Sequence, residues 1–302
     1  MKLVIALGGN ALAAGEAEKR SENIAQAARA IADIANRNDV IVTHGNGPQV
    51  GLLSLGAEAV VPGGEPLDVI GAESEGLLGY LVEQELSNRL PGRDIATLLT
   101  QVEVAPHDPA FAHPTKPIGP LMDEATARSR AAERGWVVGP DRGGWRRLVP
   151  SPDPRRILEV RTVELLMRLG VLVVCCGGGG IPVVQSNDGS HHGVEAVIDK
   201  DLSAVLLATE LGVERLLLLT DVPAVYADWP ERNQAIRSAS PRSLSGMTFE
   251  PGSMGPKVEA ACRFVRQTGG TSYIGSVSDA ARILKGEAGT IVRAGVDPIE
   301  IA

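Results

Sequence analysis

Three lysines in unusual sequence contexts are the first candidates for chemistry. The chain has 29 basic residues, but only six of them are lysine. Lys116 stands in "PTKPIGP", Lys200 in "VIDKDLSA" and Lys257 in "GSMGPK". An ammonium group is a compact charge with three donors, which suits a moving phosphoryl group, whereas the rigid arginine fork suits static bidentate binding. Because arginine is otherwise favoured, these lysines indicate a phosphate-handling site, with a solvated surface charge as the alternative for each.

Four glycine-containing loops could present backbone N–H groups to one anion. Glycine at the carboxyl end of a strand lets N–H groups turn toward one point, and a helix N-terminus adds partial positive charge there. Any one loop could be a simple strand-to-helix turn, but four of them favour a phosphate site. The usual fingerprints are missing, because no G-x-x-x-x-G-K-[ST] occurs and Pro182 replaces the last glycine of a G-x-G-x-x-G. The loops are "GGN" at 8–10, "HGNGPQVG" at 44–51, "CGGGGIP" at 176–182 and "PGSMGPK" at 251–257.

Two aspartates flank Lys200 at the predicted start of a helix. Asp199 is a plausible N-cap residue, and capping alone accounts for one aspartate. Asp201 could favour the helix start in the same way, or it could orient ammonium groups around a phosphate. The sequence leaves both interpretations of Asp201 open.

The histidines and cysteines give weaker signals. His44 opens a glycine loop and either touches a ligand or caps the turn. His191 and His192 lie in the polar loop "SNDGSHHG", where a metal site is a minor alternative. The adjacent Cys175 and Cys176 would point to opposite faces of a strand, which is poor geometry for a shared metal or an unstrained disulfide. We therefore expect both cysteines to pack in the core as small apolar groups.

Short apolar runs followed by helical patterns make up most of the chain. The runs lack polar alternation, which is typical of strands covered by helices on both faces. They predict a three-layer α/β/α sandwich with a mostly parallel central sheet, in which ligands lie at the carboxyl ends of the strands. The predicted strands are "KLVIAL", "DVIVT", "GVLVVCC", "ERLLLLT", "TSYIG" and "GTIV", and the predicted helices are 66–90, 155–169, about 200–211 and 256–268. The glycine loops fall at those strand ends.

Residues 106 to 154 break this pattern. The stretches "PHDPAFAHPTKPIGP" and "WVVGPDRGGWRRLVPSPDP" hold much of the proline and two of the three tryptophans. Because tryptophan side chains need a surface to pack on, we expect an inserted, irregular subdomain or lid rather than a linker.

Composition excludes some classes of partner. The net charge of −8 speaks against a nucleic acid or an anionic membrane surface. No apolar stretch approaches the roughly 20 residues that span a bilayer, and the N-terminal run that ends at Gly8 is too short for a signal peptide. We expect a cytoplasmic protein that binds small molecules.

As a set, these stretches resemble the carbamate kinases of the amino acid kinase family. The resemblance follows the family's order from residue 6 to residue 262 and so covers nearly the whole chain. The acetylglutamate and uridylate branches usually carry a lysine just before the first Gly-Gly, where this chain has Ala6. The matching stretches are "ALGGNAL", "THGNGPQVG", "TKPIGP", "RGGWRRLVPSP", "GGGGIPVV", "VEAVIDKD", "TDVPAVY" and "GSMGPKVEAA".

The resemblance implies a reaction and an organisation of the chain. The reaction is reversible phosphoryl transfer between ATP and carbamate, with Mg²⁺ held mainly by phosphates and water rather than by protein ligands. A single domain would consist of an N-terminal lobe to about 207 for the carbamoyl end and a lobe over 208–302 for the nucleotide. The insert at 106–154 would close over the small substrate. The family is typically a homodimer.

The resemblance also implies roles for individual residues. Lys200 would meet the transferring phosphoryl group, with Asp201 orienting the lysines. Lys257 would serve the ATP phosphates, and Lys116 would reach in from the lid. No general base is required because carbamate is already an anion, so catalysis rests on positioning and electrostatic stabilisation. The residues expected at the carbamoyl phosphate end are Gly8, Gly9, Asn10, Gly45, Asn46 and Gly47. The residues expected to bind the nucleotide are Gly177, Gly178, Gly179, Thr220, Asp221, Tyr226 and Met254.

Two other functions remain open at this point. One is a kinase of the same fold that acts on a larger acid, such as an acylamino acid. The other is a sensor of nucleotide or carbamoyl phosphate without turnover. The presence of Lys116, Lys200, Asp201 and Lys257 argues against a sensor, which has no need of lysines that meet at a transferred group.

Overall fold

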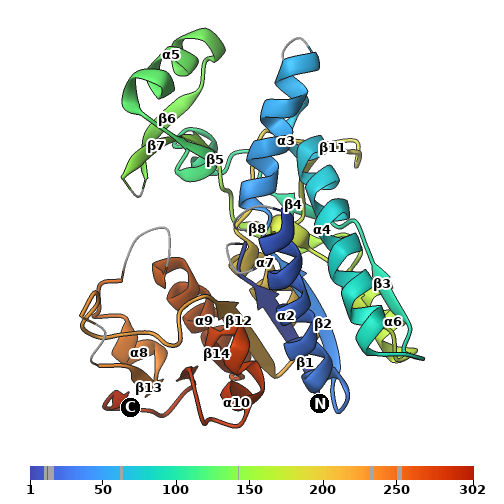
Figure 1. Cartoon of the computed structure of the whole chain (residues 1–302), viewed down its shortest axis with the longest axis vertical. Coiled ribbons are helices and arrows are strands. Elements are labelled where there is room, and N and C mark those ends of the chain that lie inside the picture. The colour runs from blue at the N-terminus through green and yellow to red at the C-terminus, as the bar shows by residue number, and fades with distance from the viewer. Residues whose placement is uncertain (10–11, 13–16, 62–63, 142, 232–233, 250–253) are drawn as a thin grey trace.

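The computed structural model describes residues 1–9, 12, 17–61, 64–141, 143–231, 234–249 and 254–302. Figure 1 shows an α/β body with a smaller unit set apart from it, beside the upper end of helix α3 (Gly47–Val60). Within those ranges, no helix combines the length and apolar character that crossing a bilayer requires.

A nine-stranded sheet forms the centre of the described fold. Strand β1, near the middle of the sheet, pairs in parallel with β2 on one side and with β12 on the other. Antiparallel pairs occur only toward one edge, between β14 and β15 and between β13 and β16. The prediction of a mostly parallel α/β sheet is therefore confirmed. From edge to edge the strands are β16 (Glu300–Ile301), β13 (Ile236–Ala239), β15 (Thr290–Val292), β14 (Thr271–Ser276), β12 (Arg215–Thr220), β1 (Lys2–Leu7), β2 (Asp39–His44), β9 (Leu172–Val174) and β3 (Ile95–Thr97).

Side chains of β1 serve two separate cores, one on each face of the sheet. Val4 and Ala6 belong to a buried cluster shared with α6, α7 and α9. Leu3, Ile5 and Leu7 belong to a second cluster shared with α2, α4 and α10. Successive side chains of a strand point to opposite faces, so a continuous apolar run is what a strand between two helical layers requires. This confirms the three-layer arrangement.

Helices cover both faces and follow the predicted pattern with one exception. The predictions of 66–90, 200–211 and 256–268 are confirmed by α4, α7 and α9. The prediction of a helix over 155–169 is wrong in its first turn, because 154–157 form strand β8 and the helix begins at Val160. The helices are α2 (Ala17–Ala35), α3 (Gly47–Val60), α4 (Leu67–Arg89), α5 (Glu124–Arg134), α6 (Val160–Arg168), α7 (Lys200–Glu210), α8 (Pro241–Leu244), α9 (Met254–Thr268) and α10 (Ala280–Leu284), with 3₁₀ turns η1 (Pro109–Phe111), η2 (Gly177–Gly179) and η3 (Val277–Asp279).

A four-stranded sheet lies beside the main one. Strand β10 pairs in parallel with β4 and antiparallel with β11, and β4 pairs antiparallel with β8. The chain therefore enters and leaves the inserted region through paired strands on the body. Its strands are β11 (His191–Gly193), β10 (Ile181–Gln185), β4 (Gln101–Val104) and β8 (Pro154–Ile157).

The inserted region is a regular small subdomain, and the expectation of irregular structure is wrong. It contains an antiparallel sheet in the order β5 (Lys116–Met122), β7 (Gly144–Val149), β6 (Val137–Asp141), with α5 alongside. We call residues 116–149 the inserted subdomain. Figure 1 shows it in green, apart from the body and close to α3.

Arginines provide the surfaces on which the two tryptophans of this subdomain pack. The guanidinium of Arg128 lies 4.9 Å from the ring centroid of Trp145, and that of Arg147 lies 4.8 Å from the ring centroid of Trp136. Such cation–π pairs stabilise an aromatic ring without a large apolar core. The subdomain thus holds its fold with few buried apolar side chains.

The adjacent cysteines are buried, as expected, but they do not point to opposite faces. Strand β9 ends at Val174, and Cys176 has a left-handed backbone with φ of 52°. Both cysteines therefore join the same core cluster. A hydrogen bond with Cys175, together with burial, raises the pKa of the Cys176 thiol well above its usual value. Both side chains pack in the core, and the Cys176 thiol stays protonated near pH 7.

Candidate active site

Three lysines gather around two aspartates at the first turn of α7. Lys200 Nζ donates to Oδ1 of Asp201 at 2.5 Å, and Lys257 Nζ donates to Oδ2 of the same carboxylate at 3.0 Å. Lys116 Nζ donates to Oδ2 of Asp199 at 2.9 Å. These five residues form what we call the lysine cluster. The structure thus brings together all four residues that were expected to be catalytic.

The two aspartates have different local roles. Oδ1 of Asp199 accepts from the backbone N–H of Asp201 at 2.9 Å, so Asp199 is the N-cap residue that the sequence predicted. The Asp201 carboxylate instead lies between two ammonium groups and is only 3% exposed. Of the two interpretations left open for Asp201, the geometry therefore favours the one in which it orients lysines.

Burial and mutual charge set the protonation states of the lysine cluster. Burial alone would raise the pKa of Asp201, but Lys200 and Lys257 hold it below its usual range. Burial lowers the pKa of Lys200 to about 8, a shift that Asp201 partly opposes and Lys257 adds to. For Lys257, Asp201 outweighs burial and the pKa is raised. Near pH 7 both lysines therefore carry a charge.

The lysine cluster attracts anions. Three ammonium groups face two carboxylates, so one positive charge remains uncompensated. Helices α7 and α9 both begin here, because Lys200 and Lys257 lie in their first turns. Each helix N-terminus adds roughly half a positive charge, and the two together make a phosphate group the natural ligand.

Glycines allow the loops that follow β1 and β2 to touch each other and Lys200. A Cβ atom on Gly45 would lie 2.7 Å from the backbone N of Gly9 and 3.0 Å from Cδ of Lys200. No side chain larger than hydrogen fits there. The N–H of Gly8 donates to the carbonyl of Leu219 at 2.8 Å, and that of Gly45 to the carbonyl of Leu7 at 3.0 Å. Both donors are thus already used within the sheet.

The N-terminus of α3 is open toward this region. Asn46 precedes the helix without capping it, because its Nδ2 donates to Ser74 Oγ at 2.7 Å instead. A Cβ atom on Gly47 would have no heavy atom within 4 Å among the described residues. Five of the six residues expected to bind the carbamoyl end thus lie together, and Asn10 is outside the described residues.

The four consecutive glycines at 177–180 lie against protein groups rather than open space. A Cβ atom on Gly178 would lie 1.9 Å from Nδ2 of Asn46, and one on Gly179 would lie 2.5 Å from the carbonyl oxygen of Ile198. Gly178 also has a φ of +69°, which favours glycine. Gly178 of this loop thus contacts Asn46, which was expected at the carbamoyl end, whereas the loop itself was expected on the nucleotide side.

Glu75 of α4 fixes this glycine loop, and the sequence analysis missed it. Its carboxylate is 1% exposed and accepts from the backbone N–H of Gly177 at 2.8 Å and of Thr100 at 3.2 Å. Burial raises its pKa to about 8. The sequence could have indicated Glu75 only through its position. Ser74 and Glu75 lie on the buried stripe of α4, which is otherwise mostly apolar.

His44 is a second buried group beside the loop. A Cβ atom on Gly177 would lie 2.5 Å from Cε1 of His44 and 2.8 Å from Cγ of Glu75, so the two side chains flank this glycine. Burial lowers the pKa of His44 to about 4, and the charge of Lys200 adds to the effect. His44 is therefore neutral near pH 7 and does not serve as an acid there.

Residues expected on the nucleotide side occupy a separate set of elements. Thr220 ends β12, and its hydroxyl donates to Oδ1 of Asp221 at 3.0 Å. Met254 begins α9 and packs against the core, three residues before Lys257. Tyr226 lies on the segment that follows β12, in an isolated bridge with Ala235. These residues lie at the carboxyl end of β12 or follow it in the chain.

The paired histidines do not form a metal site in the described structure. His191 Nε2 lies 3.4 Å from the Arg156 guanidinium, and His192 Nε2 contacts the hydroxyl of Ser186. Over the described ranges, no cluster of three or more His, Cys, Asp or Glu side chains could hold a metal ion.

Comparisons with known proteins identify the family of this chain. The model of the amino acid kinase family matches residues 1–276. A curated relative named carbamate kinase from Haemophilus influenzae is 50% identical over 297 residues, which is 96% of this chain and 96% of the relative. One from Rhizobium meliloti is 49% identical and covers 97% of this chain and 93% of the relative.

Solved structures show the same fold. Carbamate kinase from Giardia lamblia bound to AMP-PNP matches with a TM-score of 0.86 at 38% identity, covering 97% of this chain and 98% of that one. Family model, curated sequences and structure thus agree over nearly the full length of the chain. The chain belongs to the amino acid kinase family, within its carbamate kinase group, and is a phosphotransferase that uses a nucleotide.

Proposed function

We propose that this chain transfers a phosphoryl group reversibly between Mg·ATP and carbamate, giving ADP and carbamoyl phosphate. The observation that carries the proposal is the lysine cluster, in which lysines from three elements meet at the paired carboxylates of Asp199 and Asp201. A reaction between two anions needs such a concentration of positive charge where they meet.

Lys200 is the proposed partner of the transferring phosphoryl group. It is the most central lysine, since its ammonium is paired with Asp201 and its stem passes beside Gly45. Asp201 holds Lys200 and Lys257 at a fixed separation, so neither has to reorganise as charge moves from one oxygen to another. Asp201 is a positioning residue in this scheme.

The carbamoyl side of the site is assigned to the loops after β1 and β2 and to the start of α3. Gly9, Asn46 and Gly47 are the proposed contacts, because the N–H groups of Gly8 and Gly45 are used within the sheet. Lys116 closes this side from the inserted subdomain. Because Gly178 packs against the Asn46 side chain, we propose that the loop of Gly177, Gly178 and Gly179 supports the carbamoyl side instead of binding the nucleotide.

The nucleotide side is assigned to the lobe over 208–302. Lys257 binds the ATP phosphates in this proposal, and Thr220, Asp221, Tyr226 and Met254 line the nucleotide site. Mg²⁺ enters as part of the nucleotide substrate and keeps most of its oxygen ligands from phosphate and water. The nearest carboxylates, Asp199 and Asp201, are engaged by lysines.

The chemistry requires no proton transfer by the protein. Carbamate attacks through an oxygen that is already negatively charged, so His44, which is neutral near pH 7, need not act as a base. The enzyme contributes in-line positioning and charge stabilisation. Because ATP is a substrate in this proposal, we also propose that the protein acts in the cytoplasm.

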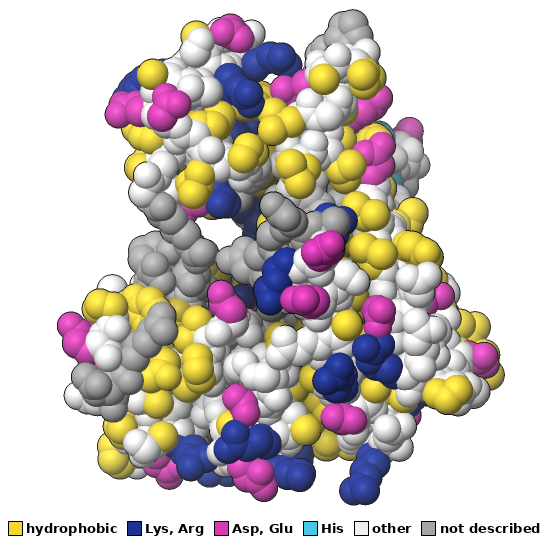
Figure 2. Space-filling view, viewed as in Figure 1, with side chains coloured by type: hydrophobic (Ala, Val, Ile, Leu, Met, Phe, Trp, Pro, Cys, Tyr) yellow, Lys and Arg dark blue, Asp and Glu magenta, His cyan; other side chains and the backbone are white. Residues whose placement is uncertain are grey.

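We also propose a homodimer, formed through the β3 edge of the main sheet. Tyr80 of α4, Leu99 after β3 and Leu169 at the end of α6 are exposed large apolar side chains on this side. Figure 2 shows apolar side chains along the face where α4 and β3 lie in Figure 1. Tyr80→Asp with Leu169→Asp should convert a dimer into a monomer in light scattering, whereas a mass unchanged by these substitutions would refute this interface.

A linked assay tests the proposed reaction. Purified protein with carbamoyl phosphate and Mg·ADP should produce ATP, detected through hexokinase, and EDTA should abolish turnover. Lys200→Ala serves as the matched inactive variant. Activity with ATP and acetylglutamate or UMP, without turnover of carbamoyl phosphate, would contradict the proposal. Tight nucleotide binding without any turnover would instead indicate a sensor.

A further inference from the structure

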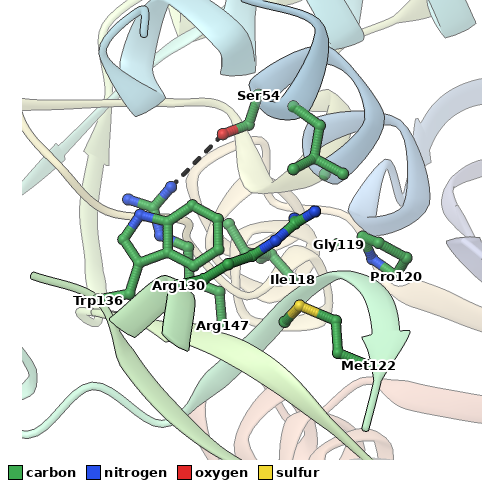
Figure 3. A pocket seen from close by; sticks show the side chains of 10 residues that line it. Ser54, Ile118, Gly119, Pro120, Met122, Arg130, Trp136 and Arg147 are labelled. Carbon is green, nitrogen blue, oxygen red and sulfur yellow. Dashed lines mark hydrogen bonds between the residues drawn. The ribbon is translucent and has the colours of Figure 1, made fainter. Parts of the chain in front are cut away.

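A cleft lies between α3 and the inserted subdomain, which touch each other where Gly51 of α3 meets Gly119 of β5. About 270 Å³ of space lies between its walls, a volume that includes open solvent. Ser54 and Leu55 of α3 form one wall, and residues of β5, α5 and β7 form the other. Figure 3 shows the side chains of both walls turned toward the same space. Nothing in the proposed phosphoryl transfer uses this cleft.

Two arginines line the cleft, and the side chain of one of them has no partner among the described residues. Arg147 donates to Ser54 Oγ at 3.4 Å, stacks on Trp136 and lies 3.9 Å from a carboxylate oxygen of Glu195. Arg130 makes no hydrogen bond or ion pair with any residue in the part of the chain that the structure describes. In Figure 3 its side chain extends across the cleft toward Gly119 and Pro120.

The charge around the cleft is positive on a chain that is negative overall. Glu58 of α3 is paired with Arg134 at 3.1 Å, and the Glu195 side chain is 60% exposed. With Arg130, Arg134 and Arg147 counted against Glu58 and Glu195, one positive charge remains. Burial lowers the pKa of Arg147, although Glu195 and Glu58 oppose this shift. A negative group in the cleft would relieve that cost of burial.

The rest of the lining is apolar and flat. The Trp136 ring, Met122 and Ile118 come from the inserted subdomain, and Leu55 lines the cleft from α3. Ligand pockets typically combine such apolar walls with a few polar groups that fix orientation. A guanidinium without a partner selects a carboxylate, with which it forms two parallel hydrogen bonds.

We infer that this cleft binds a small organic anion, a carboxylate on a short flat apolar body, separately from the phosphoryl-transfer site. Arg130 pairs with the carboxylate, Arg147 adds positive charge, and the Trp136 and Met122 side chains cover the apolar body. Such a ligand touches both α3 and the inserted subdomain. It therefore links the position of the subdomain that carries Lys116 to an anion other than the substrates.

Calorimetric titration with benzoate tests the inference, with benzyl alcohol as the neutral analogue. Benzoate should bind the intact protein with a Kd on the order of 1 mM, and benzyl alcohol at least tenfold more weakly. Arg130→Gln should weaken benzoate binding at least tenfold. Arg128→Gln is the matched control, since it removes the same charge from the same helix but from a side chain that lies over Trp145.

A second variant separates the cleft from the lysine cluster. Benzoate binding should stay within twofold in Lys257→Ala, and benzoate should change tryptophan fluorescence in the intact protein but not in Trp136→Phe. The inference is overturned if no benzoate binding is measurable, if benzyl alcohol binds equally well, or if Arg130→Gln binds benzoate normally. Loss of binding in Lys257→Ala would overturn it as well, because benzoate would then occupy the phosphate site.

Discussion

Lys257 and Asp201, which are 56 residues apart in the chain, form a 3.0 Å ion pair that joins the first turns of α9 and α7. The other oxygen of the same carboxylate binds Lys200. Because all three side chains are largely buried, the positions of these ammonium groups are set by the packing of α7 on α9. Asp201 of α7 thus holds both Lys257 of α9, the proposed partner of the nucleotide, and its own neighbour Lys200.

Lys257→Ala should weaken nucleotide binding and slow the reaction together. The ammonium is proposed to contact phosphates in both the ground state and the transition state, and its removal also leaves one Asp201 oxygen without its partner. We expect at least a tenfold rise in the Kd for ADP and a larger loss of kcat. Lys285→Ala, at an exposed lysine, is the control. Normal ADP affinity and turnover in Lys257→Ala would exclude Lys257 from the site.

Lys116→Ala should affect one substrate and spare the other. Its ammonium pairs with Asp199 across the gap between the inserted subdomain and the body. We expect kcat/KM for carbamoyl phosphate to fall at least tenfold, or about 1.4 kcal/mol, with ADP affinity within twofold. Steady-state kinetics and calorimetry measure the two quantities. Equal losses for both substrates would mean that Lys116 supports the whole site.

The activity should decline on the alkaline side because Lys200 must carry a proton. Burial lowers its pKa to about 8, and a lysine is charged only below its pKa. For the free enzyme, kcat/KM for carbamoyl phosphate should therefore fall as the pH rises through about 8. Bound phosphate favours the charged form, so kcat should hold to higher pH. A kcat/KM that stays flat to about pH 10 would contradict this role.

Glu75 could produce a similar profile, since burial raises its pKa to about 8 as well. The variant Glu75→Gln removes that titration and keeps an acceptor oxygen for the N–H of Gly177. If Lys200 is responsible, the alkaline decline should persist in Glu75→Gln at the same pH. Disappearance of the decline would assign it to Glu75 and the glycine loop.

Gly51→Ala should disturb the inserted subdomain, whereas Gly56→Ala should stabilise α3. Alanine is favoured over glycine inside a helix by about 1 kcal/mol. A Cβ atom on Gly51 would lie 2.0 Å from Cα of Gly119, but one on Gly56 meets nothing within 4 Å among the described residues. We expect Gly51→Ala to lower both the Tm and kcat/KM for carbamoyl phosphate. Equal stabilisation by both substitutions would mean that the backbone contact between Gly51 and Gly119 can rearrange at little cost in free energy.

The central sheet could be predicted from the sequence because each strand is marked by its own continuous apolar run. Strand β1 spans the predicted run at 2–7, and burial on both faces leaves an apolar residue at every position from Leu3 to Leu7. The helix expected over 155–169 failed at its start, where 154–157 pair with β4 some 50 residues earlier. Long-range pairing outweighed local pattern there.

Site residues could be predicted from the sequence where their residue type is rare in this chain. They could not be predicted where their role depends only on their position in the fold. The lysines and Asp201 were found because lysine is rare in this chain. Glu75 is one of many acidic residues, and its role follows only from its place on the buried stripe of α4. Likewise, the pairing of Trp136 with Arg147 orders the inserted subdomain through a contact between separate strand segments.

Strands β2, β1 and β12 are immediate neighbours, and their carboxyl ends carry His44, Leu7 and Thr220. Adjacent strands in a sheet are about 4.8 Å apart. On the proposed assignment, the carbamoyl side follows β1 and β2 and the nucleotide side follows β12, so one strand spacing separates donor and acceptor. On this assignment, the hydrogen bonds between the strands fix the distance over which the phosphoryl group is transferred. An extra strand between β1 and β12 would double that gap and put the acceptor out of reach.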